Sequence, residues 1–283
     1  MAEVCVGLKG GLGNQLFQYA AGRALARRLN ATLSLHPGPP RRGIRSYALG
    51  ELGIDVPLRA PTGARARIWH RFQNLRRGLG LIEVKTPLGW QGPVFCEREV
   101  GYDARIEDVA GDVYLSGFFQ SAAYFRTIGP ELGAELSAAL APHRPAGIPG
   151  DAISLHCRRG DYAQGAAAQT HGTLDRAYYV RALDKMREIA PDAPVLLFSD
   201  DLAGAREMLS GLDIQPIDGG SRLADLAGMA ACAHHVIANS TFSWWGGWIG
   251  HSGATIAPRD WYQPGSKPQA LIDALYEDSW HVV

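Results

Sequence analysis

Two adjacent arginines, Arg158 and Arg159, follow a short apolar run in the segment HCRRGDY, residues 156–162. A guanidinium binds pyrophosphate oxygens bidentately, stays charged at physiological pH and stabilises negative charge on a departing phosphate. Consecutive side chains of a strand point to opposite faces, so we expect one arginine to bind phosphate and the other to form a structural ion pair, with Asp161 as a candidate partner. The segment therefore predicts a site for a phosphorylated ligand.

Another apolar run ends in FSDD, residues 198–201, which places the carboxylates of Asp200 and Asp201 next to each other in the chain. Adjacent carboxylates favour metal chelation to a nucleotide pyrophosphate less than a DxD spacing does. Two uses remain open. Ser199 or Asp200 suits the N-cap of the helix that follows, and one carboxylate can accept hydrogen bonds from the N1 and amino donors of guanine. Both can hold, with one residue each.

The segment ANSTFSWWGGWIG, residues 238–250, places small polar residues at the start of an expected helix. Such residues bind phosphate oxygens through side chains and backbone N–H groups, and the helix dipole adds to the attraction. The candidates are Asn239, Ser240, Thr241 and Ser243. The tryptophans of this segment are too costly to expose together. We therefore expect them in the core or between domains rather than as an aromatic floor beneath a sugar.

Near the N-terminus, GGLGNQLFQYA forms a glycine turn between an apolar run and an expected helix. A dinucleotide-binding fingerprint requires a third glycine where Leu16 stands, and an acidic residue after the second strand, which ends in His36 and Pro37. Both are absent, which argues against a NAD-dependent oxidoreductase. The turn either caps the helix or lets its N-terminus approach a ligand or a second domain. The candidate contacts are Gly11, Asn14 and Gln15.

The second half of the chain alternates short apolar runs with helical patterns, which is typical of a parallel sheet wrapped by helices. We expect strands at 152–158, 195–200, 213–218, 235–239 and 254–258, and helices near 174–189, 202–210, 222–232, 243–250 and 268–278. In such a sheet the ligand lies outside the carboxyl ends of the strands, where the polar segments above stand. The alternation therefore predicts a polar, anionic ligand in this half.

The first half begins in the same way, and its elements are expected as strands at 4–8, 31–37 and 112–119 and helices at 14–30 and near 121–139. Residues 38–110 show poor periodicity. The proline- and glycine-rich segment APHRPAGIPG, residues 141–150, predicts the domain boundary. We therefore expect an N-terminal domain at 1–145 and a C-terminal domain at 146–283.

The composition is that of a globular protein: 46% of the 283 residues are hydrophobic and the formal net charge is zero. No run reaches the roughly 20 apolar residues of a membrane span, and no secretory signal is evident, so we expect a cytoplasmic protein. Four cysteines are scattered without metal-ligand spacing, which predicts reduced, buried side chains and no bound metal.

Positive charge gathers in residues 41–77, which contain Arg41, Arg42, Arg45, Arg59, Arg65, Arg67, Arg71, Arg76 and Arg77. The cluster is either a solvated surface or a docking face for anionic lipid at the inner membrane. Few aromatic residues accompany it, which argues against a nucleic-acid partner.

The four motifs GGLGNQLFQYA, HCRRGDY, FSDD and ANSTFSWWGGWI, in this order and at these separations, resemble those of the bacterial alpha-1,2-fucosyltransferases, in the galactoside 2-alpha-L-fucosyltransferase family. The resemblance extends from residue 4 to about residue 262. It implies an α/β enzyme of the GT-B type, with two Rossmann-like domains and a cleft between them. The implied reaction is metal-independent transfer of L-fucose, with inversion, from GDP-beta-L-fucose to the 2-hydroxyl of a galactose.

The resemblance also implies roles for single residues. Arg158 matches the family's pyrophosphate-binding arginine, His156 lies on the guanosine side, and Asp201 or Asp200 meets the guanine. Ser240, Thr241 and Ser243 lie near phosphate, and Asn14 and Gln15 lie near the sugar or acceptor. The N-terminal domain is then the acceptor side and the C-terminal domain binds the GDP-sugar, without a cofactor.

The proton acceptor is less defined. Asp161 is our candidate base, because the residues AQGAAAQT that follow the arginine motif contain no acid. A carboxylate of the first domain, or stabilisation of the leaving group alone, remains an alternative. Two other functions also remain open, which are transfer from another GDP-sugar and carbohydrate binding without catalysis.

Overall fold

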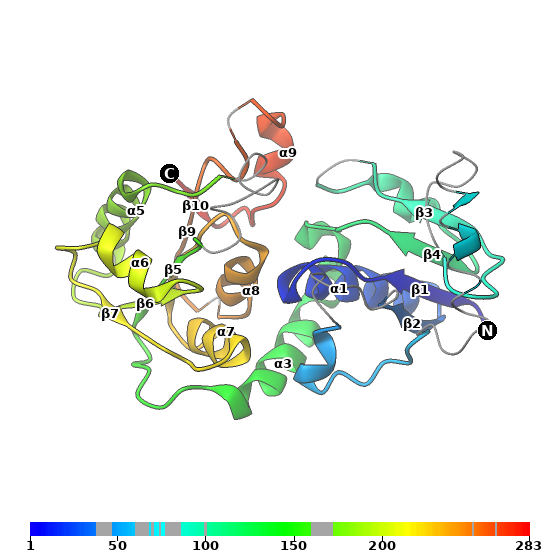
Figure 1. The fold of residues 1–283 in the computed structure, drawn as a ribbon, viewed down its shortest axis with the longest axis horizontal. Coiled ribbons are helices and arrows are strands. Elements are labelled where there is room, and N and C mark those ends of the chain that lie inside the picture. The colour runs from blue at the N-terminus through cyan, green and yellow to red at the C-terminus, as the bar shows by residue number, and fades with distance from the viewer. Residues whose placement is uncertain are drawn as a thin grey trace. The chain divides into compact units, whose positions relative to one another are not determined.

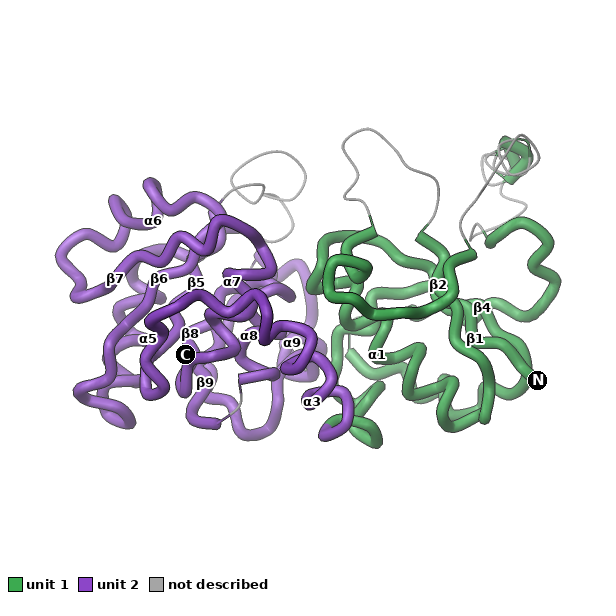
Figure 2. Tube along the Cα trace, turned by 90° about the horizontal axis from the view of Figure 1, so that it is seen from below, with its two compact units in different colours: residues 1–129 green, residues 130–283 purple. Residues whose placement is uncertain are grey.

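The computed structural model of the protein consists of two compact units, residues 1–129 and residues 130–283 (Figure 2). The structure describes residues 1–37, 47–59, 68, 71–73, 75–76, 86–98, 101–159, 172–250, 252–263 and 265–283. Each unit contains one β-sheet, in which every described strand pair is parallel. The predicted α/β class is therefore confirmed.

The sheet of the first unit has the strand order β2-β1-β4-β3 (Figure 1). Its strands are β1 (Glu3–Gly7), β2 (Thr32–His36), β3 (Val94–Cys96) and β4 (Val113–Ser116). Helix α1 (Leu12–Arg28) connects β1 to β2 and packs tightly on β1, since a Cβ at Gly22 would lie 2.3 Å from Cγ2 of Val6. These positions confirm the expected strands at 4–8, 31–37 and 112–119 and the helix at 14–30. Strand β3 lies where no pattern predicted an element.

Short 3-10 turns account for much of the remaining described chain in this unit. They are η1 (Leu49–Leu52), η2 (Ala104–Asp108), η3 (Ala122–Tyr124) and η4 (Arg126–Ile128). The helix predicted near 121–139 is therefore only partly correct, because η3 and η4 precede α3 (Gly129–Leu140). Pro130 lacks the N–H group that would bond the carbonyl of Arg126, so the α-helix cannot extend further toward the N-terminus.

The boundary between the units falls after Gly129, earlier than the predicted boundary in residues 141–150. Helix α3 belongs to the second unit and buries Leu132, Leu136 and Leu140. A Cβ at Gly133 would lie 3.8 Å from the ring of Trp248. The proline- and glycine-rich segment, which contains η5 (Ala141–His143), follows this helix within the second unit.

The sheet of the second unit has the order β10-β9-β8-β5-β6-β7. Its strands are β5 (Ile153–Cys157), β6 (Val195–Ser199), β7 (Gln215–Pro216), β8 (His234–Val236), β9 (Thr255–Ala257) and β10 (His281–Val282). The five predicted strands correspond to β5–β9, and β10 was not predicted. From β5 the chain adds strands on one side, and at β8 it returns to the other side. The carboxyl ends of β5 and β8 are therefore a topological switch point.

Helices cover both faces of this sheet (Figure 1). They are α5 (Arg176–Ile189), α6 (Leu202–Met208), α7 (Arg222–Ala230), α8 (Thr241–Ile249) and α9 (Gln269–Asp273). On one face, Ile153, Leu155 and Cys157 of β5 share a core with residues of α5 and α6. On the other face His156 contacts Phe242 of α8. The alternation of side chains along β5 thus separates two layers.

The four cysteines are unpaired, and Cys5, Cys157 and Cys232 are buried, as predicted, whereas Cys96 is only partly buried. Across the part of the chain that the structure describes, no helix combines the length and apolarity needed to cross a membrane.

Candidate functional site

The carboxyl edge of β5, β6 and β8 brings together the polar residues that the sequence analysis selected. Arg158 and Arg159 follow β5, Asp200 and Asp201 follow β6, and Asn239 follows the end of β8. Because β5 lies between β6 and β8, these segments meet at the switch point of the second unit.

Asp200 holds the arginine segment in place. Its Oδ2 lies 3.0 Å from Nη1 of Arg158, and its Oδ1 accepts a hydrogen bond of 3.0 Å from the backbone N–H of Arg159. The side chains of Arg158 and Asp200 are 12% and 26% exposed, so this ion pair is largely shielded from water. The guanidinium of Arg158 is therefore oriented before any ligand arrives.

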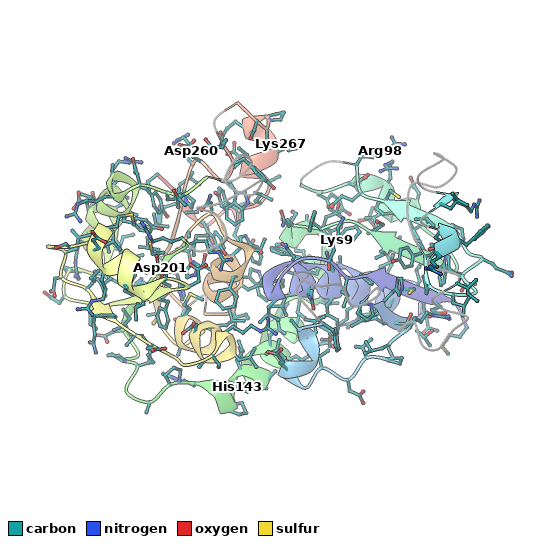
Figure 3. The ribbon with its side chains drawn as sticks, viewed as in Figure 1. Lys9, Arg98, His143, Asp201, Asp260 and Lys267 are labelled. Atoms are coloured by element: carbon teal, nitrogen blue, oxygen red, sulfur yellow. The ribbon has the colours of Figure 1, made fainter. Side chains whose placement is uncertain are left out.

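Asp201 has a different role, as the N-cap of α6. Its Oδ1 accepts a 3.0 Å hydrogen bond from the N–H of Gly204, and its Oδ2 lies 3.4 Å from Nε of Arg159. Figure 3 shows Asp201 beside this helix. The expectation that Ser199 or Asp200 caps the helix is wrong, because Ser199 Oγ accepts from the Asp201 N–H and donates to the Cys157 carbonyl. Ser199 thereby aims Asp201 at the first turn of α6.

The two arginines have different carboxylate partners. Arg159 pairs with Asp201, and its Nη1 lies 3.3 Å from Sδ of Met208 in α6. Arg158 has the same parity along the chain as His156, which faces α8. Both arginines are therefore ion-paired, and neither partner is the predicted Asp161; which arginine binds phosphate stays a prediction. Asp161 itself lies outside the described residues.

His156 is a buried, neutral imidazole beside Arg158. It is 3% exposed, and burial, with the neighbouring Arg158 charge as a second cause, lowers its pKa to about 3. Its ring centroid lies 5.9 Å from that of Phe242. Its buried Nδ1 has no hydrogen-bond partner among the described residues. A buried nitrogen in this state requires a bonding group beyond the described residues.

Polar side chains fix the loop between β8 and α8. Ser240 caps α8 by accepting from the Phe242 N–H, and the hydroxyl of Ser243 accepts from the Ala238 N–H at 3.2 Å. Asn239 Nδ2 donates to the carbonyls of Gly172 at 3.2 Å and of Trp261 at 3.4 Å. These three residues are buried and Thr241 is partly exposed. The loop thus places the positive end of the α8 dipole at the switch point.

Two of the three tryptophans of α8 belong to the core, as predicted, and Trp248 is partly exposed. Trp244 and Trp245 are 1% and 0% exposed. The indole of Trp244 donates to the Leu275 carbonyl, and that of Trp248 donates to the carboxylate of Glu277. The ring centroids of Trp244 and Trp280 lie 5.4 Å apart. Trp244 and Trp245 therefore anchor α8 and are not available as an aromatic floor for a sugar.

Comparison with known proteins places this arrangement in a family. The sequence model described as "Glycosyl transferase family 11" matches residues 105–283, which is more than half of the chain. The chain belongs to this family. It is 28% identical to an alpha-1,2-colitosyltransferase of Escherichia coli over 93% of each chain. It is 25% identical to the galactoside 2-alpha-L-fucosyltransferase Sec1 of Mus musculus, over 96% of this chain and 72% of the mouse protein.

Among solved structures, the family 11 chain is similar to the heptosyltransferase WaaC of Escherichia coli, determined with ADP. The TM-score is 0.50 and the identity 10%, over 99% of this chain and 92% of WaaC, so the likeness concerns the fold alone. It confirms the predicted GT-B type. The match to the family model identifies the chain as a fucosyltransferase-like glycosyltransferase.

In the first unit of this glycosyltransferase, the predicted contact residues surround the glycine turn. Gly11 is the N-cap of α1, and Asn14 Oδ1 accepts from Gln120 Nε2 at 2.8 Å. Gln15 is 2% exposed, donates to the Gly10 carbonyl and accepts from the Ala48 N–H. Gln15 thus holds the turn, whereas Asn14 is partly exposed.

Sequence reasoning did not select Gln18, which is fully buried. Its Oε1 accepts from the Lys9 N–H at 3.0 Å, and its Nε2 donates to the carbonyls of Lys9 and Gly117. The signal was present, because Gln18 stands four residues after Asn14, on the same helix face. Its polar side chain on the buried side of α1 was the indication.

Most of the arginine cluster of residues 41–77 lies outside the described residues, and only Arg59, Arg71 and Arg76 are described. Arg59 forms an ion pair with Glu3, and its guanidinium lies 5.8 Å from the ring centroid of Trp90. Contact with a membrane stays a prediction. In the described part of the chain, no group of three or more His, Cys, Asp or Glu side chains is placed to hold a metal ion.

Proposed function

We propose that this glycosyltransferase moves L-fucose from GDP-beta-L-fucose to the 2-hydroxyl of a terminal galactose, with inversion at the anomeric carbon. The motif resemblance and the similarity to the mouse 2-alpha-L-fucosyltransferase support the donor and the acceptor. The observation that carries the proposal is the oriented Arg158. Asp200 holds it at the switch point, beside a neutral His156 and the N-terminus of α8.

Each donor residue has a role that its surroundings support. Arg158 binds the pyrophosphate, together with Thr241 and the backbone of α8 that Asn239, Ser240 and Ser243 hold. His156 lies on the guanosine side. Asp201 is the better candidate for the guanine, because its side chain is 44% exposed and that of Asp200 is 26% exposed, while both carboxylates pair with an arginine.

The chemistry follows from where charge develops. The acceptor hydroxyl attacks the anomeric carbon while the bond to GDP breaks, so negative charge grows on the leaving pyrophosphate. The guanidinium of Arg158 stabilises that charge, which a divalent metal does in other transferases. Asp200 and Asp201 support this proposal, because both carboxylates already pair with arginines. Asp161 is the proposed base for the hydroxyl proton.

A second candidate donor comes from the Escherichia coli relative. Its name assigns it colitose transfer with an alpha-1,2 linkage, and it matches 93% of this chain. We therefore keep transfer of another sugar nucleotide as the alternative. Carbohydrate binding without catalysis is less favoured, since Trp244 and Trp245 are buried and not available to a glycan.

The proposed setting is the synthesis of a surface glycan or O-antigen in the cytoplasm, with residues 41–77 touching the inner membrane face. Salt-sensitive binding of the protein to anionic liposomes supports that contact. Binding that is absent, or unchanged by salt, removes it.

The deciding experiment is incubation with GDP-fucose and a panel of beta-galactosides, with and without EDTA, with the product linkage determined by NMR. We expect an alpha-1,2 product that forms in EDTA and is lost in Arg158→Ala. A donor panel that includes GDP-mannose and GDP-colitose tests the alternative. Absence of GDP binding in calorimetry would overturn the whole assignment.

A further inference from the structure

The first unit also has a topological switch point, between β1 and β4. These strands are adjacent in the order β2-β1-β4-β3: the chain passes from β1 outward to β2 on one side, and it reaches β4 from β3 on the other side. Residues 8–11 follow β1 and residues 117–120 follow β4. In a parallel sheet this is the position at which ligands bind.

Hydrogen bonds of the Gln18 side chain hold the two segments at this point together. Gln18 bonds the N–H and the carbonyl of Lys9 and, at 3.1 Å, the carbonyl of Gly117. One buried amide therefore fixes the segment after β1 against the segment after β4. Such locking lowers the entropy that a ligand must overcome when it orders a site.

Glu97, directly after β3, holds the segment of residues 117–120 through its carboxylate. Its carboxylate accepts from the N–H of Phe118 at 2.6 Å, from that of Phe119 at 2.9 Å and from the hydroxyl of Tyr124 at 3.2 Å. Phe119 has a φ of 55°, a left-handed conformation that is rare for an aromatic residue. Strained backbone held by such bonds is typical of functional segments.

The result is an exposed group of complementary side chains, which we call the β1/β4 cluster: Lys9, Asn14, Phe118 and Gln120. Phe118 is 40% exposed, although Phe119 beside it is fully buried. The ammonium of Lys9 lies 4.2 Å from the Phe118 ring centroid. Figure 3 shows Lys9 at this end of the first unit.

An amide pair completes the cluster. Gln120 Nε2 donates to Asn14 Oδ1 at 2.8 Å, so the two amides have a fixed relative orientation. Among the described residues, no hydrogen bond engages Nδ2 of Asn14 or Oε1 of Gln120, and both side chains are partly exposed. The pair thus offers the NH2 group of Asn14 as a donor group and the carbonyl oxygen of Gln120 as an acceptor, which suits neighbouring hydroxyl groups.

We propose that the β1/β4 cluster binds the terminal sugar of the acceptor, a neutral pyranose, and that it sets acceptor specificity. The aromatic ring of Phe118 packs against the C–H face of the sugar. The amides of Asn14 and Gln120 bond its hydroxyls, and Lys9 donates to a ring or hydroxyl oxygen. This inference rests on the proposed function for the use of the sugar, and it goes beyond that function by naming the residues that select it.

Phe118→Ala tests the proposal, with Leu88→Ala as the matched control, because Leu88 is an apolar side chain of the same unit with 45% exposure. We expect Phe118→Ala to raise the acceptor KM at least tenfold and to leave the Kd for GDP within twofold. Leu88→Ala changes neither. An acceptor KM in Phe118→Ala that matches the control overturns the proposal, and so does an equal loss of GDP affinity.

A binding measurement separates this proposal from the proposed function. Saturation-transfer NMR with methyl beta-galactoside, in the presence of GDP, reports contact with the sugar whether or not transfer occurs. A signal in the unchanged protein that disappears in Phe118→Ala supports the cluster even if fucose is not the sugar transferred. A signal that survives in Phe118→Ala, or no signal in the unchanged protein, overturns it.

Glu97 acts as a positioning residue, since its hydrogen bonds go to the chain that carries Phe118. Glu97→Gln replaces one accepting oxygen by an NH2 group that faces backbone donors. We expect the same rise in acceptor KM as in Phe118→Ala, with kcat and GDP affinity within twofold. A fall in kcat without a change in KM would instead assign Glu97 to the chemical step.

Discussion

Arg158 and Arg159 are neighbours in the chain with different tasks. We expect Arg158→Lys to raise the Kd for GDP about 10- to 100-fold, because a lysine is a point charge and cannot form two parallel bonds to phosphate. Arg159→Lys is the matched control, since Arg159 pairs with Asp201 and contacts Met208 on the other face. Calorimetric titration with GDP measures both, and equal losses of affinity would contradict the assignment.

The buried His156 predicts a dependence of stability on pH. Its folded pKa, about 3, lies below the ordinary histidine value of 6.5, because burial disfavours the charged ring. Its contribution to stability is therefore complete above about pH 6.5, and it is lost as the pH falls toward the folded pKa. The loss grows by roughly 1 kcal/mol per pH unit between that point and the folded pKa.

His156→Asn removes this titration. Denaturant unfolding between pH 8 and pH 4 should show a smaller acid loss in the variant than in the unchanged protein. Parallel curves would show that His156 does not titrate on unfolding.

At the scale of elements, the start of α7 carries an acid with the opposite behaviour. Burial raises the pKa of Asp225 to about 6. The hydrogen bond from the Gly219 N–H lowers this pKa, and the nearby Asp218 raises it further. Its stabilising contribution is present below about pH 4 and is lost as the pH rises through 6. We expect Asp225→Asn to gain about 1 kcal/mol above pH 7, solvent screening included, and nothing at pH 4. Thermal unfolding at the two pH values measures this, and an equal gain at both would contradict it.

The strands also show how much of the fold can be predicted from sequence patterns. The β5–β9 strands were predicted because buried parallel strands read as apolar runs between turns. Strand β3 was missed because it lies in residues 38–110, where the sequence shows poor periodicity, and β10 was missed at the end of the chain, where no apolar run was selected. The polar ends of β5, β6 and β8 were located correctly.

The uses of individual side chains were harder to predict. Asp201 rather than Asp200 caps α6, and Gln15 and Gln18 bond the backbone of distant loops. Those partners become neighbours only after folding, so no local pattern reports them. The roles of Glu97 and Phe118 depend on the same long-range contacts.

At the scale of the molecule, two units with separate sheets predict two separate footprints in hydrogen exchange. We expect GDP to slow exchange at residues 156–159 and 239–243 and not at residues 8–11 or 117–120. Methyl beta-galactoside added with GDP should slow exchange at residues 8–11 and 117–120. GDP at a concentration of 100 times its Kd stabilises the unit that binds it by about 2.7 kcal/mol. Protection by GDP confined to the first unit would reverse the roles assigned to the units.

The tryptophan packing in the second unit has an optical consequence. Of the seven tryptophans, Trp244, Trp245, Trp248, Trp261 and Trp280 belong to that unit. The ring centroids of Trp244 lie 5.2 Å from Trp245 and 6.2 Å from Trp248. Indoles so close exchange excitation energy, and their dry surroundings shift emission to shorter wavelengths. The intrinsic fluorescence of this protein therefore reports whether the second unit is folded.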